Sequence, residues 1–259
     1  MRLKSVFISD VHLGSRHSHA SELLEFLSLV KNCAPEKFYI VGDFIDGWKL
    51  KRNWYWDDNA SLIVRKILSL IRRETEIFWV AGNHDEFIRE FIDDFRLFNF
   101  GHIHLGNEFI HETNDKKFLV VHGDMFDLVT SYAKWLCWLG DIGYDILLYM
   151  NRFINGFRRI FKMPHWSLSK AIKYNVKKAV NYVSDFERVM IRYARDRDCA
   201  GCICGHIHTA ANTTLEDGFI YLNSGDWMES CTAILEDMDG NFKLYHHHED
   251  SDRQLLSTA

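Results

Sequence analysis

Residues 38–46 read FYIVGDFID, a short apolar run followed by a segment with two acidic residues. This pattern recurs along the chain, and apolar runs of about 4–8 residues bounded by turn-forming residues predict buried strands. Strands are predicted at Val6–Ser9, Phe38–Val41, Ile77–Val80, Phe118–Val121, Gly201–Cys204, Phe219–Leu222, Thr232–Leu235 and Phe242–Tyr245. Helical periodicity is found at Ala20–Val30 and Asn59–Arg73, between the first three strands. The alternation predicts an α/β sandwich.

The pattern changes between Met125 and about Arg197, where long helical segments replace the strands. We therefore expect one domain, residues 1–259, with a helical cap insertion at about 125–197. The insertion holds 13 Lys and Arg and 6 Asp and Glu, a net charge of +7; the whole chain carries −5, so the remainder carries −12. The overall charge argues against a nucleic-acid binder, whereas the basic insertion indicates an anionic partner.

The chain has neither an N-terminal signal pattern nor an uninterrupted apolar stretch of roughly 18 residues, so we expect a cytoplasmic protein. Six cysteines form no paired framework of the kind found in small secreted domains. Cys202 and Cys204 alternate in a predicted strand with Cys199 just before it, and no second pair completes four zinc ligands. These three are interpreted as core residues.

Polar residues cluster where the predicted strands end. The five clusters are Asp10 with His12, Asp43 with Asp46, Asn83 with His84 and Asp85, His122 with Asp124, and His206 with His208. In layered α/β folds the carboxyl ends of the strands meet in one crevice. Imidazole, carboxylate and amide ligands without thiolates suit Mn²⁺, Fe or Zn²⁺ at a catalytic site. Two such ions about 3.5–4 Å apart can clamp the attacking and leaving oxygens of a phosphoryl transfer.

These five clusters, in this order, resemble the motifs of calcineurin-like metallophosphoesterases. The resemblance implies a four-layer α/β/β/α metallophosphoesterase sandwich with a helical cap insertion. It also implies two divalent metal ions, with Mn²⁺ as first choice and Fe or Zn²⁺ as alternatives. One ion would be held by Asp10, His12, Asp43 and His208, and the other by Asp43, Asn83, His122 and His206, so that Asp43 is shared. A metal-free scaffold would be expected to have lost some of these seven residues.

The same resemblance gives His84 a catalytic role, in which it stabilises charge on phosphorus or protonates the leaving oxygen. Asp85 is predicted to orient His84, and Asp46 to act in the same way near the shared carboxylate. A second Gly-His-x-His motif, at residues 101–104, precedes His122 and does not follow a strong apolar strand. It is interpreted as structural.

Several further stretches resemble the UDP-2,3-diacylglucosamine hydrolase-like branch of this superfamily. They are residues 46–56 (DGWKLKRNWYW), 132–135 (YAKW), 166–169 (WSLS), 180–187 (VNYVSDFE) and 224–227 (SGDW). The branch implies cleavage of the pyrophosphate of UDP-2,3-diacylglucosamine into UMP and 2,3-diacylglucosamine 1-phosphate, a step of lipid A biosynthesis. At one position the chain departs from this pattern, because the best-known hydrolases of the branch carry Arg where this chain has His84. A phosphodiesterase or phosphatase acting on nucleotides or other phosphodiesters is therefore the alternative.

The predicted insertion mixes aromatic, aliphatic and basic residues, especially at residues 132–166. Such a segment suits a lipid with an anionic head, or peripheral contact with an anionic membrane surface. The resemblance implies that this surface is the cytosolic face of the inner membrane. Alternatively, its apolar side packs on the body and its charges face solvent. Cations would contact phosphates and aromatics would contact uracil or acyl chains. The candidates are Arg52, Trp54, Arg158, Arg159, Lys170, Lys177 and Trp227. The oligomeric state stays open.

Overall fold

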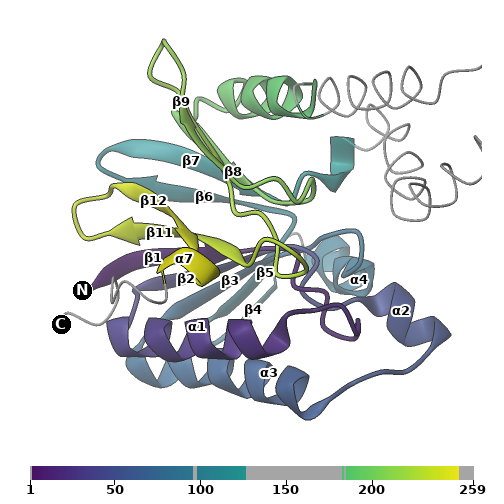
Figure 1. Cartoon of the computed structure of the whole chain (residues 1–259). Coiled ribbons are helices and arrows are strands. Elements are labelled where there is room, and N and C mark those ends of the chain that lie inside the picture. Colours follow the sequence, from purple (N-terminus) through teal and green to yellow (C-terminus); the bar gives the residue numbers. More distant parts are fainter. Residues whose placement is uncertain (1, 96–97, 127–182, 184, 251–259) are drawn as a thin grey trace, which may run out of the picture. The chain divides into compact units, whose positions relative to one another are not determined.

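The structure of the chain is a computed structural model that describes residues 2–95, 98–126, 183 and 185–250 (Figure 1). The chain divides into two compact units, one of Met1–Asp124 with Met190–Ala259 and the other of Met125–Val189. Most of the helical insertion predicted at about 125–197 lies outside the described residues. Both sheets and the candidate site belong to the first unit.

The larger sheet has seven strands in the order β12-β11-β1-β2-β3-β5-β4. Four neighbouring strands are parallel: β1 (Leu3–Ile8), β2 (Lys37–Val41), β3 (Glu76–Val80) and β5 (Ile103–Gly106). The others pair antiparallel at the two edges: β4 (Phe98–Phe100), β11 (Thr232–Asp237) and β12 (Phe242–His246). Because β1, β2 and β3 are parallel neighbours, the loops that follow them emerge at the same edge of the sheet.

The smaller sheet has five strands in the order β6-β7-β8-β10-β9. Its central strands are parallel: β7 (Lys116–Val121), β8 (Gly201–Cys204) and β10 (Ile220–Asn223). Its edge strands are antiparallel: β6 (Glu108–Thr113) and β9 (Ala211–Thr214). The two sheets pack face to face, because Phe7 and Val80 of the larger sheet share an apolar core with Val120, Ile203 and Leu222 of the smaller one.

Helices cover the other face of the larger sheet (Figure 1). α1 (Ala20–Cys33) and α3 (Asp58–Leu70) bury apolar side chains at helical spacing, such as Phe26 and Val30 in α1. On the smaller sheet, Tyr193 in the helix of residues 185–195 donates a hydrogen bond to Glu108 of β6 (3.0 Å). The layers are therefore α/β/β/α, which confirms the predicted fold. The short elements are α2 (Gly47–Arg52), η1 (Ile71–Arg73), α4 (Glu86–Phe95), η2 (Asp124–Phe126) and α7 (His247–Asp250).

The sequence patterns predict the eight most apolar strands but miss four others. β4, β5, β6 and β9 lie at or next to a sheet edge. A strand in such a position keeps polar side chains on the face or edge that meets solvent, so it lacks a continuous apolar run. In the part of the chain that the structure describes, no helix is long and apolar enough to cross a membrane.

Candidate metal centre

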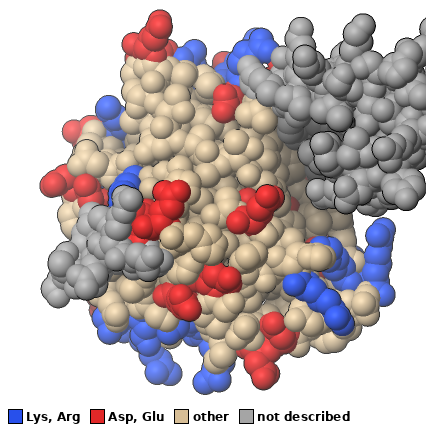
Figure 2. All heavy atoms as spheres, in the orientation of Figure 1, with Lys and Arg blue, Asp and Glu red and all other residues tan. Residues whose placement is uncertain are grey.

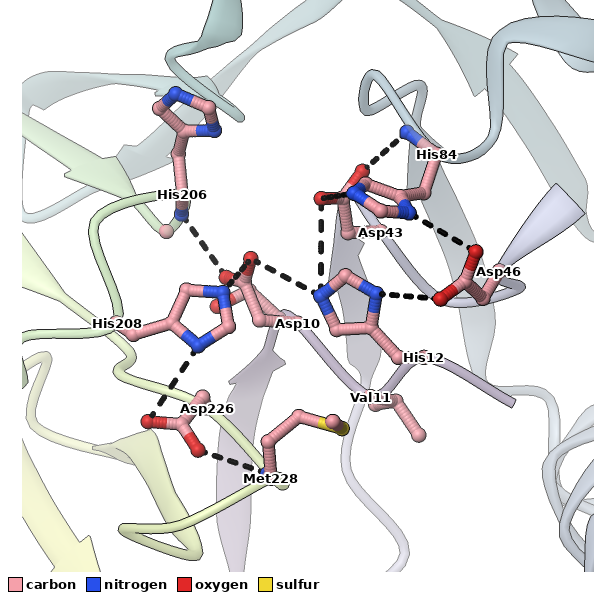
Figure 3. Close-up of polar contacts among 12 residues, drawn as sticks. Asp10, Val11, His12, Asp43, Asp46, His84, His206, His208, Asp226 and Met228 are labelled. Atoms are coloured by element: carbon pink, nitrogen blue, oxygen red, sulfur yellow. Dashed lines mark hydrogen bonds and ion pairs between the residues drawn. The ribbon is translucent and has the colours of Figure 1, made fainter. Parts of the chain in front are cut away.

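The candidate site lies where loops from both sheets meet (Figure 3). The larger sheet contributes Asp10 and His12 after β1, Asp43 and Asp46 after β2, and Asn83, His84 and Asp85 after β3. The smaller sheet contributes His122 after β7 and His206 and His208 after β8. The structure thus brings the five predicted clusters together at the carboxyl ends of parallel strands.

Backbone hydrogen bonds tie neighbouring loops together before any side chain is considered. The amide of Asp10 donates to the carbonyl of Gly42 (3.1 Å), and that of His12 donates to the carbonyl of Asp43 (2.9 Å). Gly42 has a positive φ of 81°, and a Cβ atom there would lie 2.3 Å from the ring of His122. Only glycine therefore lets these loops approach so closely.

Five of the seven predicted ligand residues adopt the left-handed backbone conformation, which is uncommon for residues other than glycine. They are Asp10 (φ 52°), His12 (52°), Asp43 (51°), His206 (70°) and His208 (53°). Each such residue costs on the order of 1–3 kcal/mol, and such conformations concentrate at functional sites. The strain turns side chains from separate strands toward a common centre.

Each of the two central carboxylates has one oxygen occupied by a backbone amide. The amide of His206 donates to Asp10 Oδ2 (2.9 Å), and the amide of His84 donates to Asp43 Oδ1 (2.8 Å). The other oxygens, Asp10 Oδ1 and Asp43 Oδ2, are the ones that face the imidazoles. Asp10 Oδ1 lies 3.2 Å from Nε2 of His208. Asp43 Oδ2 lies 3.8 Å from Nε2 of His12.

His122 is also fixed by the backbone, through a hydrogen bond on the side of its ring that faces away from Asp43. It is completely buried, and its Nδ1 donates to the backbone carbonyl of Val41 (2.8 Å). This hydrogen bond fixes the ring so that Nε2 faces the site and offers its lone pair once its proton is lost. Nε2 lies 3.4 Å from Asp43 Oδ2. Such an arrangement is typical of an imidazole that binds a cation.

Buried polar atoms without partners test whether these residues fit metal ions. Within the described part of the chain, Asp10 Oδ1, Asn83 Oδ1 and His122 Nε2 are buried and have no hydrogen-bond partner. Leaving such atoms unsatisfied is costly, and all three can bind a cation. Ligand atoms lie within 4.8 Å of one another in the group of Asp10, His12 and His208 and in the group of Asp43, His122 and His206, and a third group of His12, Asp46 and His84 adjoins them. The residues therefore fit two ions.

The pKa values describe a cavity with a strong preference for positive charge. Burial alone would raise the pKa of Asp10, but His208 and His122 hold it well below its usual range. Burial also opposes ionisation of Asp43, yet His122 lowers its pKa to about 2. Conversely, burial would lower the pKa of His122, but Asp43 and Asp10 raise it to about 10, and Asp10 raises that of His208 to about 9. A bound metal ion would displace these protons.

Asp46 contacts the Nδ1 atoms of both His12 and His84. Its Oδ1 accepts a hydrogen bond from Nδ1 of His84 (3.0 Å), and its Oδ2 lies 3.7 Å from Nδ1 of His12 (Figure 3). Burial would raise the pKa of Asp46, but the nearby imidazoles of His12 and His84 hold it well below its usual range. The indole of Trp48 covers His84, with ring centroids 4.3 Å apart. His84 thus presents Nε2 to the site, 4.0 Å from Asp43 Oδ2.

The predicted role of Asp85 is wrong, because its carboxylate does not reach the ring of His84. It accepts hydrogen bonds from the amides of Phe44 (3.0 Å) and Ile45 (2.7 Å), and from the indole of Trp79 (3.3 Å). Burial and the charge of Asp43 raise its pKa to about 7, against these three donors. Asp85 therefore supports the loop after β2, and Asp46 is the residue that orients His84.

Two positioning interactions were missed by the sequence analysis. Asp226 Oδ2 lies 3.9 Å from Nδ1 of His208, and Arg89 donates to the Asp124 carboxylate (2.7 Å) and to the carbonyl of Ala81 (3.1 Å). Asp226 follows a strand end, as the predicted ligands do, so its position was a signal. Arg89 lies in α4, and no pattern in the sequence links it to the site.

The residues predicted to contact the substrate differ in their exposure to solvent. Arg52 ends α2, and Trp54 just beyond it is 75% exposed, so both are accessible. Trp227 is 0% exposed and packs on Phe26 with ring centroids 5.1 Å apart, so its assignment to substrate contact is wrong. The loop after β10 turns this side chain into the core instead. Arg158, Arg159, Lys170 and Lys177 lie outside the described residues.

The repeated Gly-His-x-His motif is placed elsewhere. His102 and His104 both pair with Glu76, at 2.7 and 2.5 Å, and neither belongs to the groups around Asp10 and Asp43. Cys202 and Cys204 are completely buried in β8.

A hollow of about 280 Å³ opens beside His84. It is lined by Gly47, Trp48, Lys51, His84, Glu86, Phe87, Arg89 and Glu90.

Comparison with known proteins assigns the family. A family model described as calcineurin-like phosphoesterase matches residues 3–210. A UDP-2,3-diacylglucosamine hydrolase of Porphyromonas gingivalis is 25% identical and covers 92% of this chain and 99% of its own length. The corresponding hydrolase of Neisseria gonorrhoeae is 28% identical, with 93% and 96% covered. Among solved structures, an archaeal phosphodiesterase is 13% identical with a TM-score of 0.42, covering 93% and 98%. The chain belongs to the calcineurin-like phosphoesterase family and is a metal-dependent phosphoesterase.

Proposed function

We propose that the chain hydrolyses the pyrophosphate of UDP-2,3-diacylglucosamine and releases UMP and 2,3-diacylglucosamine 1-phosphate in lipid A biosynthesis. The observation that carries the reaction is the convergence of buried carboxylate oxygens and imidazole nitrogens in two neighbouring groups. The substrate is supported by relatives named for this hydrolase that align with 92% and 93% of the chain.

We infer that the site binds two divalent ions. One is assigned to Asp10, His12, Asp43 and His208, and the other to Asp43, Asn83, His122 and His206. A donor set of oxygen and nitrogen without sulfur favours Mn²⁺ over softer ions, with Fe or Zn²⁺ as alternatives. When bound, such ions neutralise phosphate charge and make a water molecule nucleophilic near neutral pH.

The protein's own contribution to the chemistry centres on His84. Because Asp46 engages Nδ1, the ring is fixed and Nε2 is the atom that can meet a phosphate oxygen or the leaving oxygen. Asp46 and Asp226 hold the rings of His12 and His208 from behind. This second layer keeps the reacting groups in place while the substrate changes geometry.

The surroundings of His84 suit a nucleotide linked to a lipid. The hollow of about 280 Å³ beside it combines the aromatic side chains of Trp48 and Phe87 with the cations Lys51 and Arg89 and the carboxylates of Glu86 and Glu90. Aromatic faces can stack on uracil or pack on acyl chains, and cations can bind the diphosphate. Arg52 and Trp54 remain candidates for substrate contact at the rim.

A peripheral contact with an anionic membrane, on the cytosolic face of the inner membrane, would give the enzyme access to such a lipid. α2 carries Lys49, Lys51 and Arg52 in its last turn, between Trp48 (44% exposed) and Trp54 (75% exposed). Figure 2 shows Lys and Arg side chains gathered at the lower right, where Figure 1 draws α2. Exposed indoles flanking cations are typical of surfaces that bind anionic lipid headgroups.

The test is UMP release from UDP-2,3-diacylglucosamine by the full chain with Mn²⁺, compared with hydrolysis of an aryl phosphodiester. We expect UMP release that is lost in Asp43→Ala, together with its bound metal. The matched control is Asp57→Ala, which replaces a carboxylate that caps α3, accepts a hydrogen bond from the Tyr55 hydroxyl (3.3 Å) and belongs to neither ligand group. If the aryl phosphodiester is cleaved but no UMP appears, the substrate assignment fails and the nucleotide or phosphodiester alternative replaces it. If neither is cleaved, the reaction class fails as well.

A further inference from the structure

A separate group of metal-ligating side chains shares no residue with the catalytic groups. Ligand atoms of His19, Cys231 and His248 lie within 4.8 Å of one another. We propose that these three residues bind a zinc ion, with Cys231 as a thiolate ligand. The ion would join the start of α1, the loop before β11 and the helix that follows β12.

The three segments are already fixed relative to one another by backbone hydrogen bonds. The amide of His19 donates to the carbonyl of Trp227 (2.8 Å), just upstream of Cys231. The amide of His247 donates to the carbonyl of Cys231 (3.0 Å), which places His248 beside it. A site whose backbone is preorganised loses little conformational entropy when an ion binds.

Cys231 has two properties expected of a ligand. It is 0% exposed and forms no disulfide, so it is protected from solution oxidants. Its φ of 51° is left-handed, as at the five strained residues of the catalytic loops. Such a conformation is costly for cysteine, and a functional direction for the thiol is the reason we assign to it.

The histidines supply the remaining protein ligands and the route of entry. Glu22 Oε1 lies 3.1 Å from His19 Nδ1, so Nε2 is the nitrogen left for an ion, as in carboxylate–histidine–zinc arrangements. His248 is exposed, and its ring centroid lies 6.4 Å from that of His19. An ion can therefore enter from solvent, and water can take the fourth position.

Ligand chemistry selects the ion. One thiolate and two imidazoles suit tetrahedral Zn²⁺, whose bonds of about 2.0–2.3 Å bring ligand atoms to within about 3.6 Å of one another. Because the ligand atoms lie no more than 4.8 Å apart, closing the group requires a movement of at most about 1 Å, which rotation of the exposed His248 ring can supply. The catalytic groups contain no cysteine, so a thiolate bond to metal would distinguish this site from them.

The experiment uses the metal-free, tag-free full chain titrated with Co²⁺, a tetrahedral substitute for Zn²⁺. Thiolate bound to Co²⁺ gives a near-ultraviolet charge-transfer absorption that carboxylate and imidazole ligands do not give. We expect this absorption in the wild type and its loss in Cys231→Ser and in His248→Ala, each of which should bind one ion fewer. Cys33→Ser, which changes another buried cysteine that forms no disulfide, is the matched control and should retain the absorption.

Two readings of the titration would overturn the proposal. One is a wild type saturated with Co²⁺ that shows no charge-transfer absorption. The other is an absorption that persists in Cys231→Ser or is unchanged in His248→Ala, because the thiolate would then belong to another group. Circular dichroism and hydrolysis of an aryl phosphodiester should be unchanged in all variants. Should Cys231→Ser fail to fold, the exposed His248 still decides the question.

Discussion

Replacing Asp46 by Asn removes a buried charge that faces two imidazoles of the site. Oδ1 lies 3.0 Å from His84 Nδ1 and Oδ2 lies 3.7 Å from His12 Nδ1. Asn retains one oxygen, so it can still accept the hydrogen bond from the amide of Lys49 (2.9 Å) that caps α2. The substitution should therefore weaken the interactions within the site and leave the cap of α2 intact.

The magnitude follows from the contacts that change. A charge-assisted hydrogen bond to His84 becomes a neutral one of about half the strength, and an amide NH₂ group replaces the oxygen that faces His12. Changes to such outer partners typically cost about 10–100-fold in activity or metal affinity. This corresponds to about 1.4–2.7 kcal/mol at the transition state. We expect kcat/KM for an aryl phosphodiester to fall by this factor.

The assay combines kcat/KM at saturating Mn²⁺, the Mn²⁺ affinity and the thermal unfolding midpoint. Asp57→Asn is the matched control, because Asp57 caps α3 through the amide of Ala60 (2.8 Å) and has no role in the site. It should leave all three quantities near their wild-type values. If Asp46→Asn stays within about twofold of the wild type in both kcat/KM and metal affinity, the positioning role of Asp46 is refuted.

Three further predictions concern the supports of the site. Arg89→Ala leaves the Asp124 carboxylate, which is only 7% exposed, without its cation. The free energy of unfolding measured by urea denaturation should therefore fall by about 1–3 kcal/mol. An unchanged midpoint would contradict a stabilising role of the Arg89–Asp124 ion pair. Asp85→Asn removes an acceptor for one of two loop amides, and a similar loss is expected, together with weaker Mn²⁺ binding in a metal titration. In the metal-free chain the raised pKa values of His122 (about 10) and His208 (about 9) contribute stability below about pH 6.5 that is lost as the pH rises through them. Unfolding midpoints in chelator should therefore fall from pH 6.5 upward, and saturating Mn²⁺ should remove most of this slope.

The sequence predicts the parts of the site that depend on strand ends, and it fails where side-chain direction decides. Asp10 and His122 are predictable because each directly follows an apolar run in a layered fold. The roles of Asp46 and Asp85 could not be separated, because Asp85 directly follows His84 in the sequence whereas Asp46 lies in another loop. Only the three-dimensional path of each loop decides which carboxylate meets the ring. Trp227 was misassigned for the same reason, since an indole in a loop can point to solvent or to the core.

The same limit applies to the strands. β5 contains His104 at a position that meets Glu76, so its polar face hides the strand from an apolar pattern. The pairing of β5 with β3 supplies the missing stability through backbone hydrogen bonds, which the sequence does not encode locally.

The left-handed residues of the catalytic loops have a consequence for the order in which the enzyme matures. Their strain is carried by pairing between loops of one sheet, such as Asp10 with Gly42, and by the hydrogen bond from the His206 amide to the Asp10 carboxylate between the sheets. We therefore expect both sheets to form before the ligand atoms converge. We therefore expect metal uptake to be the final step of maturation, made by a chain that is already folded. Amide hydrogens in these loops should exchange faster in the metal-free enzyme, while those of β1 and β2 remain protected. A cell short of metal would accumulate a folded but inactive reserve that a supply of ions can activate without new synthesis.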